Sequence, residues 1–263
     1  MKKVTINKLR DMKKNGEKIA CLTAYDAAFA RILDQSGIDV ILVGDSLGMV
    51  LHGDDTTLKV TMQDMIYHSR LVKSECRNAL LVTDMPFMSY ATPAQALGNA
   101  ARLMSEGGAE IVKLEGGAPV AGTIHYLSEH DIPVCAHLGL TPQSVHKIGG
   151  YHVQGKDQPT AKRILADAKL LEEAGAIMLV LECIPRQLAA EITQSVSMPV
   201  IGIGAGGGCD GQVLVLYDIL GITDRQLRFS KNFLENSASI KTAISNYISA
   251  VKSGEFPAEE HQF

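Results

Sequence analysis

The sequence lacks any apolar run of the roughly 18 residues that a membrane-spanning helix requires. The segment Met1–Lys18 is rich in lysine, yet it contains no central apolar stretch of the kind that defines a secretory signal. We therefore expect no membrane partner and a cytoplasmic location.

Paired cysteine motifs are also missing. The five cysteines are odd in number and scattered along the chain, and no two of them form a C-x-x-C pair. Most of them fall within or beside predicted strands. This pattern is typical of reduced thiols in a cytosolic protein.

A strong charge of one sign is absent as well. The 25 basic and 29 acidic residues give a formal net charge of −4. Such a chain offers no electrostatic footprint for a nucleic acid, so we expect small-molecule substrates instead. No low-complexity or Pro/Ser-rich linker interrupts the sequence, which indicates one domain over residues 1–263.

What the sequence does contain is a regular series of short apolar runs, each followed by polar or glycine residues. Buried parallel strands read as such runs, and helical patterns separate most of them. The chain is therefore predicted to form an α/β fold, a (β/α)8 TIM barrel with an N-terminal helix and a C-terminal helical tail. The predicted strands are Ile19–Thr23, Val40–Val43, Ala79–Thr83, Ile111–Leu114, Pro133–Ala136, Ile177–Leu181, Pro199–Ile203 and Val213–Tyr217.

Several segments depart from the repeat. A short helix capped by Thr5 precedes the first strand and is expected to cover the bottom of the barrel. Residues 138–159 are too many for an ordinary connection and predict a loop or flap at the active face. Only residues 204–212 separate the last two strands, which leaves no room for a helix. The tail from Gln226 onward is of the kind that often packs on a neighbouring subunit.

Three acidic residues stand at the ends of consecutive predicted strands, namely Asp45, Asp84 and Glu115. Residues after barrel strands converge on one rim, so these carboxylates should meet there. Like charges in a cleft persist only when they are protonated or when a cation lies among them. Oxygen ligands favour a hard ion, and we expect one Mg²⁺ per subunit. The alternative is that Asp45 caps a loop and Asp84 a turn before Pro86.

Lys113 and Glu115 lie two residues apart on one predicted strand, so both should point to the same face. An inward-facing Lys113 beside the acidic cluster would bind an anionic substrate, whereas a solvated lysine at the rim is the alternative. His137 ends the fifth strand, where barrel enzymes carry functional groups. A lone histidine at such a place can also be purely structural.

Glu182 follows the apolar run 177–181. Desolvation by these neighbours should raise its pKa toward neutrality, which suits a general base. Pairing with Arg186 or Lys113 is the alternative. The glycine run 204–208 either presents backbone N–H groups to an anion or serves a tight turn, and no Walker or dinucleotide pattern accompanies it.

Together these residues describe a site for a 2-oxo acid. The carboxylate and ketone oxygens of such an acid can chelate Mg²⁺. The metal would then stabilise the enolate that forms when Glu182 removes a proton from the adjacent carbon. Composition and spacing lead no further.

Eight segments, in order along nearly the whole chain, carry a more specific signal. They are LTAYD (22–26), VGDSLGM (43–49), DMPFMSY (84–90), VKLEGG (112–117), HLGLTPQS (137–144), LECIP (181–185), IGIGAG (201–206) and EEH (259–261). Taken together, they resemble the 3-methyl-2-oxobutanoate hydroxymethyltransferase family, also called ketopantoate hydroxymethyltransferase.

The resemblance implies transfer of a hydroxymethyl group from the co-substrate 5,10-methylenetetrahydrofolate to 3-methyl-2-oxobutanoate. The products would be 2-dehydropantoate, on the route to pantothenate and coenzyme A, and tetrahydrofolate. Glu182 would be the proton acceptor. The family is also known for assemblies of ten subunits in two stacked pentamers, so the resemblance implies a homodecamer.

By position, the resemblance also assigns the metal and substrate contacts. Asp45 and Asp84 are implied to ligate Mg²⁺ directly, with Glu115 near the ion and acting through water. The substrate-binding residues implied are Asp45, Ser46, Asp84, Lys113 and His137. Two local departures, at residues 207–209 and 227–229, touch none of these positions.

Two other functions compete with this one. The first is a Mg²⁺-dependent lyase or mutase of the phosphoenolpyruvate/isocitrate type that acts on a 2-oxo acid. Such enzymes usually carry a reactive-loop cysteine in a Lys-Lys-Cys-Gly-His-like run, which this sequence lacks. The second is a non-catalytic barrel that binds a metabolite, which would have no need for Glu182 beside three metal-type carboxylates.

Overall fold

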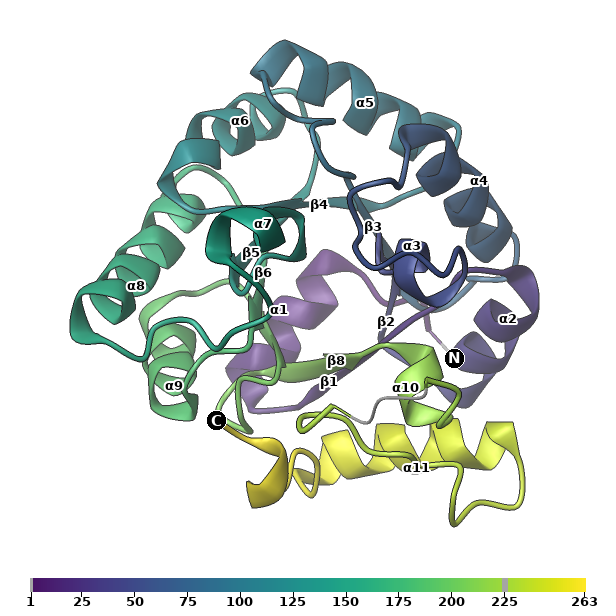
Figure 1. The fold of residues 1–263 in the computed structure, drawn as a ribbon. Coiled ribbons are helices and arrows are strands. Elements are labelled where there is room, and N and C mark those ends of the chain that lie inside the picture. The colour runs from purple at the N-terminus through teal and green to yellow at the C-terminus, as the bar shows by residue number, and fades with distance from the viewer. Residues whose placement is uncertain (1, 224–226) are drawn as a thin grey trace.

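A closed barrel of eight parallel strands, surrounded by helices, forms the centre of the protein (Figure 1). The computed structural model describes residues 2–223 and 227–263. Each strand pairs with the next one along the chain, and β8 pairs with β1 to close the barrel. The predicted TIM-barrel fold is therefore confirmed. The strands are β1 (Ile19–Thr23), β2 (Val40–Val43), β3 (Leu80–Asp84), β4 (Ile111–Glu115), β5 (Val134–Gly139), β6 (Met178–Glu182), β7 (Val200–Ile203) and β8 (Gly211–Leu214).

Helices follow most strands and begin where the sequence offers caps. Thr92 accepts a hydrogen bond from the backbone N–H of Gln95, with Pro93 as the first helical residue. The α-helices are α1 (Ile6–Asn15), α2 (Ala27–Ser36), α3 (Leu47–Val50), α4 (Met62–Lys73), α5 (Pro93–Ser105), α6 (Ala118–Ser128), α7 (Val145–Ile148), α8 (Gln158–Glu173), α9 (Arg186–Ser195), α10 (Leu216–Ile219) and α11 (Ile240–Ser253). Two short 3₁₀ helices are η1 (Pro142–Ser144) and η2 (Glu259–His261).

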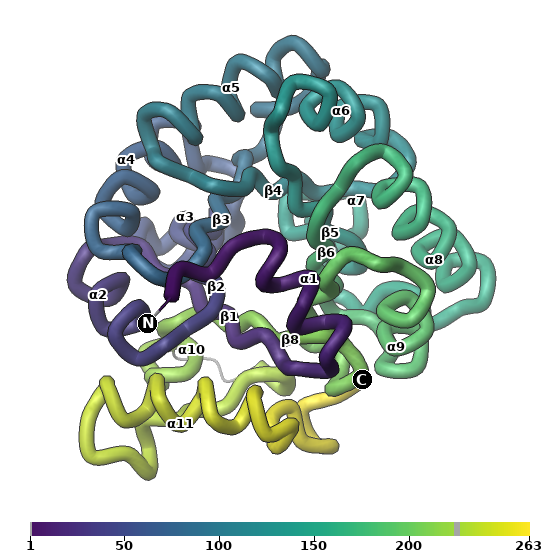
Figure 2. Tube along the Cα trace, turned by 180° about the vertical axis from the view of Figure 1, so that it is seen from behind, coloured from purple at the N-terminus to yellow at the C-terminus, as the bar shows by residue number. Residues whose placement is uncertain are grey.

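The N-terminal helix closes the bottom of the barrel, as predicted. Thr5 caps α1, and the helix ends at Gly16 in a left-handed conformation. Leu9 and Met12 are buried in one apolar cluster with inward-facing strand residues such as Ile19. Seen from behind, α1 crosses the middle of the barrel (Figure 2). The opposite end, at the carboxyl ends of the strands, is therefore the open one.

The eighth strand begins and ends earlier than predicted. The apolar run Val213–Tyr217 contains the end of β8 and the first residues of the short helix α10. The backbone N–H of Leu216 donates to Thr23 Oγ1 over 2.9 Å, at the point where the chain leaves the sheet. An apolar run alone does not show where a buried strand passes into a buried helix.

The C-terminal tail also differs from its prediction. Gln226, where the tail was predicted to begin, lies outside the described residues, and the helix α11 covers only Ile240–Ser253. This helix packs on β1 and α2 of its own chain. Its Tyr247 hydroxyl lies 2.8 Å from the carbonyl oxygen of Cys21 and 3.0 Å from that of Gln212. The apolar face of α11 thus completes the outer ring of the barrel.

Two expectations from composition can be compared with the fold. All five cysteines lie in the described residues, where they are buried and form no disulfide. Over these residues, no helix combines the length and the apolarity of a membrane-spanning segment.

Candidate active site

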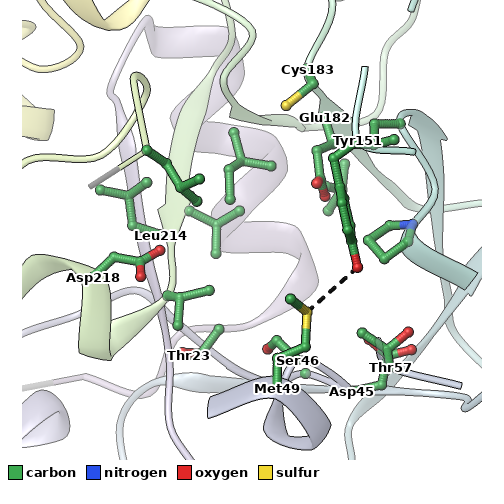
Figure 3. A pocket seen from close by; sticks show the side chains of 18 of the residues that line it. Thr23, Asp45, Ser46, Met49, Thr57, Tyr151, Glu182, Cys183, Leu214 and Asp218 are labelled. Carbon is green, nitrogen blue, oxygen red and sulfur yellow. Dashed lines mark hydrogen bonds between the residues drawn. The ribbon is translucent and has the colours of Figure 1, made fainter. Parts of the chain in front are cut away.

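A cavity of about 660 Å³ opens at the carboxyl ends of the strands. All the site residues predicted from the sequence line it, although they come from five different strands and the loops that follow them. These residues, which we call the inner site, are Asp45, Ser46, Asp84, Lys113, Glu115, His137 and Glu182. Figure 3 shows several of them around the cavity.

Strand register brings the charged groups side by side. Asp84, the last residue of β3, lies opposite Lys113 of β4. Glu115, the last residue of β4, lies opposite His137 of β5. Lys113 and Glu115 both point into the barrel, as the alternation along a strand predicted. A solvated lysine at the rim is excluded, because the Lys113 side chain is only 4% exposed.

Lys113 is the centre of this charge cluster. Its ammonium lies 3.1 Å from Asp84 Oδ1, 3.1 Å from His137 Nδ1 and 3.9 Å from Glu115 Oε1. Burial alone would lower the pKa of Lys113, but the carboxylates of Asp84, Glu115 and Asp45 outweigh this effect and raise it. The lysine is therefore a permanent positive charge inside the barrel.

Asp45 and Asp84 form a close acidic pair. The backbone N–H of Asp45 donates to Asp84 Oδ2 over 3.0 Å. Burial, and then the charges of Asp84 and Glu115, hold the pKa of Asp45 well above its ordinary value. Burial also raises the pKa of Asp84, against the opposing effect of Lys113. A cation bound between the two carboxylates would relieve this repulsion.

The donor set fits Mg²⁺ better than it fits a closed metal cage. Asp84 Oδ1 is buried and accepts no well-directed hydrogen bond, although Lys113 lies nearby. Within residues 2–223 and 227–263, no three His, Cys, Asp or Glu side chains are grouped closely enough to hold an ion by themselves. Mg²⁺ is commonly bound by one or two carboxylates and keeps several waters. Asp45 and Asp84 can supply that pair.

Glu115 is occupied by other partners. Its Oε2 accepts a hydrogen bond from the backbone N–H of Gln143 over 3.0 Å, and its Oε1 lies 3.5 Å from His137 Nδ1. Burial would raise the pKa of Glu115, but the contacts with His137 and Lys113 lower it. This carboxylate therefore stays ionised and balances the two cationic side chains.

Gln143 was not singled out as a site residue from the sequence. It is buried in η1, just after β5, and its Nε2 donates to Asp45 Oδ2 over 2.8 Å and to the carbonyl oxygen of Met85 over 2.9 Å. The Tyr90 hydroxyl donates to its Oε1. One amide thus joins the segment after β5 to the loops after β2 and β3. The only available signal was its position in the HLGLTPQS segment.

Glu182 faces the imidazole of His137 rather than Arg186 or Lys113. Its Oε2 lies 3.4 Å from His137 Nε2. Burial and the Lys113 ammonium lower the pKa of His137, but contacts with the carboxylates of Glu115 and Glu182 outweigh them and raise it to about 9. The side chain of Glu182 is 16% exposed, so it is largely desolvated but still reaches the cavity.

The backbone around Glu182 is tightly constrained. Cys183 has a φ of 47°, a left-handed conformation that is uncommon for a residue with a side chain. Its N–H donates to the carbonyl oxygen of Ile203, and its own carbonyl accepts from the N–H of Gln154. Gly139 (φ 95°) leaves room for the neighbouring strand, since a Cβ there would lie 2.2 Å from the Glu182 carbonyl oxygen. These contacts fix Glu182 at the rim.

The segment 138–159 lies over the active face, as predicted. Its helix α7 lies in front of the barrel mouth (Figure 1). The hydroxyl of Tyr151 lies 3.7 Å from the sulfur of Met49, which follows β2, so the two side chains meet across one side of the cavity (Figure 3). Ser46, another residue that lines the cavity, has its Oγ 2.8 Å from the Tyr25 hydroxyl.

The glycine run serves close packing and a tight turn. Gly204 has a φ of 59°, and a Cβ there would lie 3.0 Å from the ring of Phe229 and 3.2 Å from that of Phe263. Of the two interpretations left open by the sequence, the contacts of this residue favour the structural one.

The sequence profile and the relatives that match this chain carry the name of one enzyme family. The sequence profile of ketopantoate hydroxymethyltransferase matches residues 3–259 of the chain. The 3-methyl-2-oxobutanoate hydroxymethyltransferase of Nitrosococcus oceani is 57% identical over 261 residues, which cover 99% of both chains. That of Shewanella loihica is 56% identical over 264 residues, which cover 100% of both.

Solved structures of lower identity share the fold. A 2,3-dimethylmalate lyase, described as a PEP mutase/isocitrate lyase superfamily member, aligns with a TM-score of 0.60 and 18% identity over 82% of each chain. A phosphonopyruvate hydrolase aligns with a TM-score of 0.63 and 12% identity over 83% of this chain and 84% of its own. Identities this low support the barrel fold and nothing more about the chemistry.

The central position of Lys113 predicts a large and pH-dependent loss of stability in Lys113→Met. Removing one partner of a buried charge cluster costs about 3–5 kcal/mol. Without the ammonium, the pKa of Asp84 in the folded state rises further. The loss of stability should therefore be greatest above this pKa, where Asp84 is ionised. It should shrink as the pH falls toward the pKa of Asp84 in the unfolded chain. Denaturant unfolding at several pH values, with a chelator present, measures it.

A matched control is Lys73→Met, which removes an ammonium that lies 3.5 Å from Glu110 near the surface. It should cost less than about 1 kcal/mol. Equal losses in the two variants would contradict the central role of Lys113.

Proposed function

The chain belongs to the ketopantoate hydroxymethyltransferase family, and from this premise we propose that it converts 3-methyl-2-oxobutanoate to 2-dehydropantoate in pantothenate synthesis. The family resemblance seen in the sequence segments is thereby confirmed, and the protein is a hydroxymethyltransferase. The observation that carries the proposal is the relationship to enzymes of this name over the whole chain. The charged cavity at the barrel mouth supplies groups suited to the reaction.

We propose 5,10-methylenetetrahydrofolate as the donor of the one-carbon unit. In this reaction C3 of the oxo acid loses its proton and forms a bond to the methylene carbon. The bond from that carbon to the folate nitrogen breaks, and water supplies the hydroxyl oxygen. The products are 2-dehydropantoate and tetrahydrofolate.

Asp45 and Asp84 are the residues we propose to hold one Mg²⁺ per subunit. Asp84 Oδ1, which accepts no well-directed hydrogen bond, and the raised pKa of Asp45 support this role. Glu115 would remain near the ion without ligating it directly. When bound, Mg²⁺ would contribute positive charge that favours negative charge on the keto oxygen of the substrate.

Ser46, Lys113 and His137 are proposed to contact the oxo acid, together with the two aspartates. The buried ammonium of Lys113 would balance the substrate carboxylate or the charge that develops after proton loss. The Nε2 of His137 lies 3.4 Å from Glu182 Oε2, and its Nδ1 lies 3.1 Å from the Lys113 ammonium. His137 would therefore hold the Glu182 carboxylate in place.

Glu182 is the proposed base that removes the C3 proton. It is the inner-site carboxylate that ends β6, and it lines the cavity with 16% of its side chain exposed. Its Oε2 lies 3.4 Å from His137 Nε2, so the imidazole would help to orient the carboxylate. A positioned base of this kind contributes about 10²–10⁴-fold to a rate.

The lyase or mutase alternative is not favoured. It shares the barrel fold, but the solved structures of that type are only 12–18% identical to the chain. Hydroxymethyltransferases at 53–57% identity over nearly the full length are far more similar.

Glu182→Gln should abolish the exchange of the C3 hydrogen of 3-methyl-2-oxobutanoate with solvent deuterium, in the absence of folate. We expect a decrease of about 10²–10⁴-fold, because the amide cannot accept the proton. Binding of the oxo acid should change little. Proton NMR in D₂O measures exchange, and calorimetry measures binding. Glu191→Gln, an exposed substitution in α9, is the control; unchanged exchange in Glu182→Gln would remove this residue from the base role.

Asp84→Ala should weaken Mg²⁺ binding by at least about 100-fold, since losing even an outer partner of a metal ligand costs about 10–100-fold. A Mg²⁺ titration by calorimetry measures the loss without relying on activity. Asp55→Ala changes an exposed carboxylate at the cavity rim and should bind Mg²⁺ normally. Undiminished C3 exchange in the presence of a chelator would refute the metal site.

We also propose a cytoplasmic homodecamer built as two stacked pentamers. The support for the assembly is the family resemblance, and the support for the location is the set of buried cysteine thiols without disulfides in the described residues. Sedimentation equilibrium of the native protein should give a mass ten times that of one chain. A monomeric or dimeric mass at micromolar concentration would contradict this proposal.

A further inference from the structure

The cavity continues well beyond the inner site. Its volume of about 660 Å³ falls in the range of about 300–1,000 Å³ that is typical for ligands of drug size, and exceeds what a five-carbon oxo acid requires. On the side of α10 it is lined by Asp218, Thr223, Arg228, Phe229 and Phe263, which we call the outer lobe. None of these residues belongs to the inner site.

Asp218 is an unusual feature of the outer lobe, because it is a buried carboxylate that pairs with no cationic side chain among residues 2–223 and 227–263. The residue is 9% exposed, and its carboxylate points into the cavity from the side opposite Glu182 and Tyr151 (Figure 3). Thr223 Oγ1 donates to Asp218 Oδ1 over 2.6 Å, and no other described residue donates to the carboxylate. Burial raises its pKa, against the effect of this hydrogen bond. The carboxylate can therefore accept further hydrogen bonds from a ligand in the cavity.

Two aromatic rings line the same cavity as this carboxylate. The rings of Phe229 and Phe263 pack edge to face with centroids 6.4 Å apart. The guanidinium of Arg228 lies 5.2 Å from the centroid of the Phe263 ring. Arg228 is otherwise exposed, so its remaining donors are open to solvent. The outer lobe thus combines an anionic acceptor, flat apolar surfaces and one cationic group.

We propose that the outer lobe binds the folate donor, with Asp218 bound to the aminopyrimidinone edge of its pterin ring. This inference rests on the proposed function and deepens it. The pterin presents a ring N–H and a 2-amino group side by side, which match the two oxygens of a carboxylate, as a guanidinium does. Thr223 holds one of these oxygens in place, and that oxygen retains a second lone pair.

The rest of the donor fits the remaining groups of the lobe. The p-aminobenzoyl ring stacks on Phe229 or Phe263, as aromatic pairs do. The glutamate carboxylates pair with Arg228 at the open end. The pterin lies deepest, because Asp218 is buried while Arg228 is exposed. The one-carbon unit attached to the pterin then faces the oxo acid in the inner site.

Asp218→Asn tests the inference with tetrahydrofolate as the probe. The amide keeps the shape but loses the charge and one acceptor. Losing a charge-assisted hydrogen bond should raise the Kd of tetrahydrofolate, measured by calorimetry, by about 10–100-fold. The KM of the methylene donor should rise similarly. The KM of the oxo acid and the rate of C3 exchange, which need no folate, should stay within about 2-fold of wild type and show that the barrel is intact.

Asp55→Asn is the matched control, because it removes a carboxylate from the rim of the same cavity at an exposed position. Its Kd for tetrahydrofolate should not increase. A second probe removes the need for a stable variant: a tetrahydrofolate analogue with a methyl group in place of the 2-amino group should bind the wild-type protein about 10–100-fold more weakly.

The outcomes separate the inference from the proposed function. An unchanged Kd for tetrahydrofolate in Asp218→Asn, or equal binding of the two probes by the wild type, overturns the inference. A wild-type protein that exchanges C3 hydrogen but binds no tetrahydrofolate also overturns it, while leaving the inner site as proposed. A protein that exchanges no C3 hydrogen contradicts the proposed function, and the tetrahydrofolate titration still decides what the outer lobe binds.

Discussion

Charge balance around one buried ammonium governs the inner site. Lys113 lies among Asp84, Glu115 and His137 at distances of 3.1–3.9 Å, in a place from which the barrel wall and the segment above it exclude most water. Each of these groups would be costly to bury alone, and each is tolerable because of the others. The carboxylates remain in excess over the cationic side chains. The site is therefore preorganised to accept a further positive charge, and its electrostatics follow from the strand register.

Much of this arrangement could be predicted from the sequence, because a barrel converts chain order into spatial order. The inward direction of Lys113 and Glu115 could be predicted from the alternation of side chains along a strand. The positions of Asp84 and His137 at the rim could be predicted from the ends of their apolar runs. Gln143 could not be predicted in the same way. Its amide connects groups that follow different strands, and this depends on how the chain returns over the barrel mouth, which no local pattern describes.

Predictions from local apolarity were less accurate where residues distant in the sequence form the surroundings of a side chain or helix. The run beside Glu182 predicted a desolvated carboxylate but not its neighbours, which are His137 on one side and the cavity on the other. The run Val213–Tyr217 passes from a strand into a helix without a change in polarity. The role of α11 likewise depends on contacts with β1 and α2, far away in the sequence.

The pairing of β8 with β1 also has a consequence for how the chain is made. Ile19 lies opposite Gly211, and α11 covers β1 only after the chain has passed Ile240. During translation, the edge of β1 that pairs with β8 therefore stays unpaired until almost the whole polypeptide has left the ribosome. Bare strand edges invite association between nascent chains. The seam between the first and last strands is thus the part of the molecule most dependent on protection during translation.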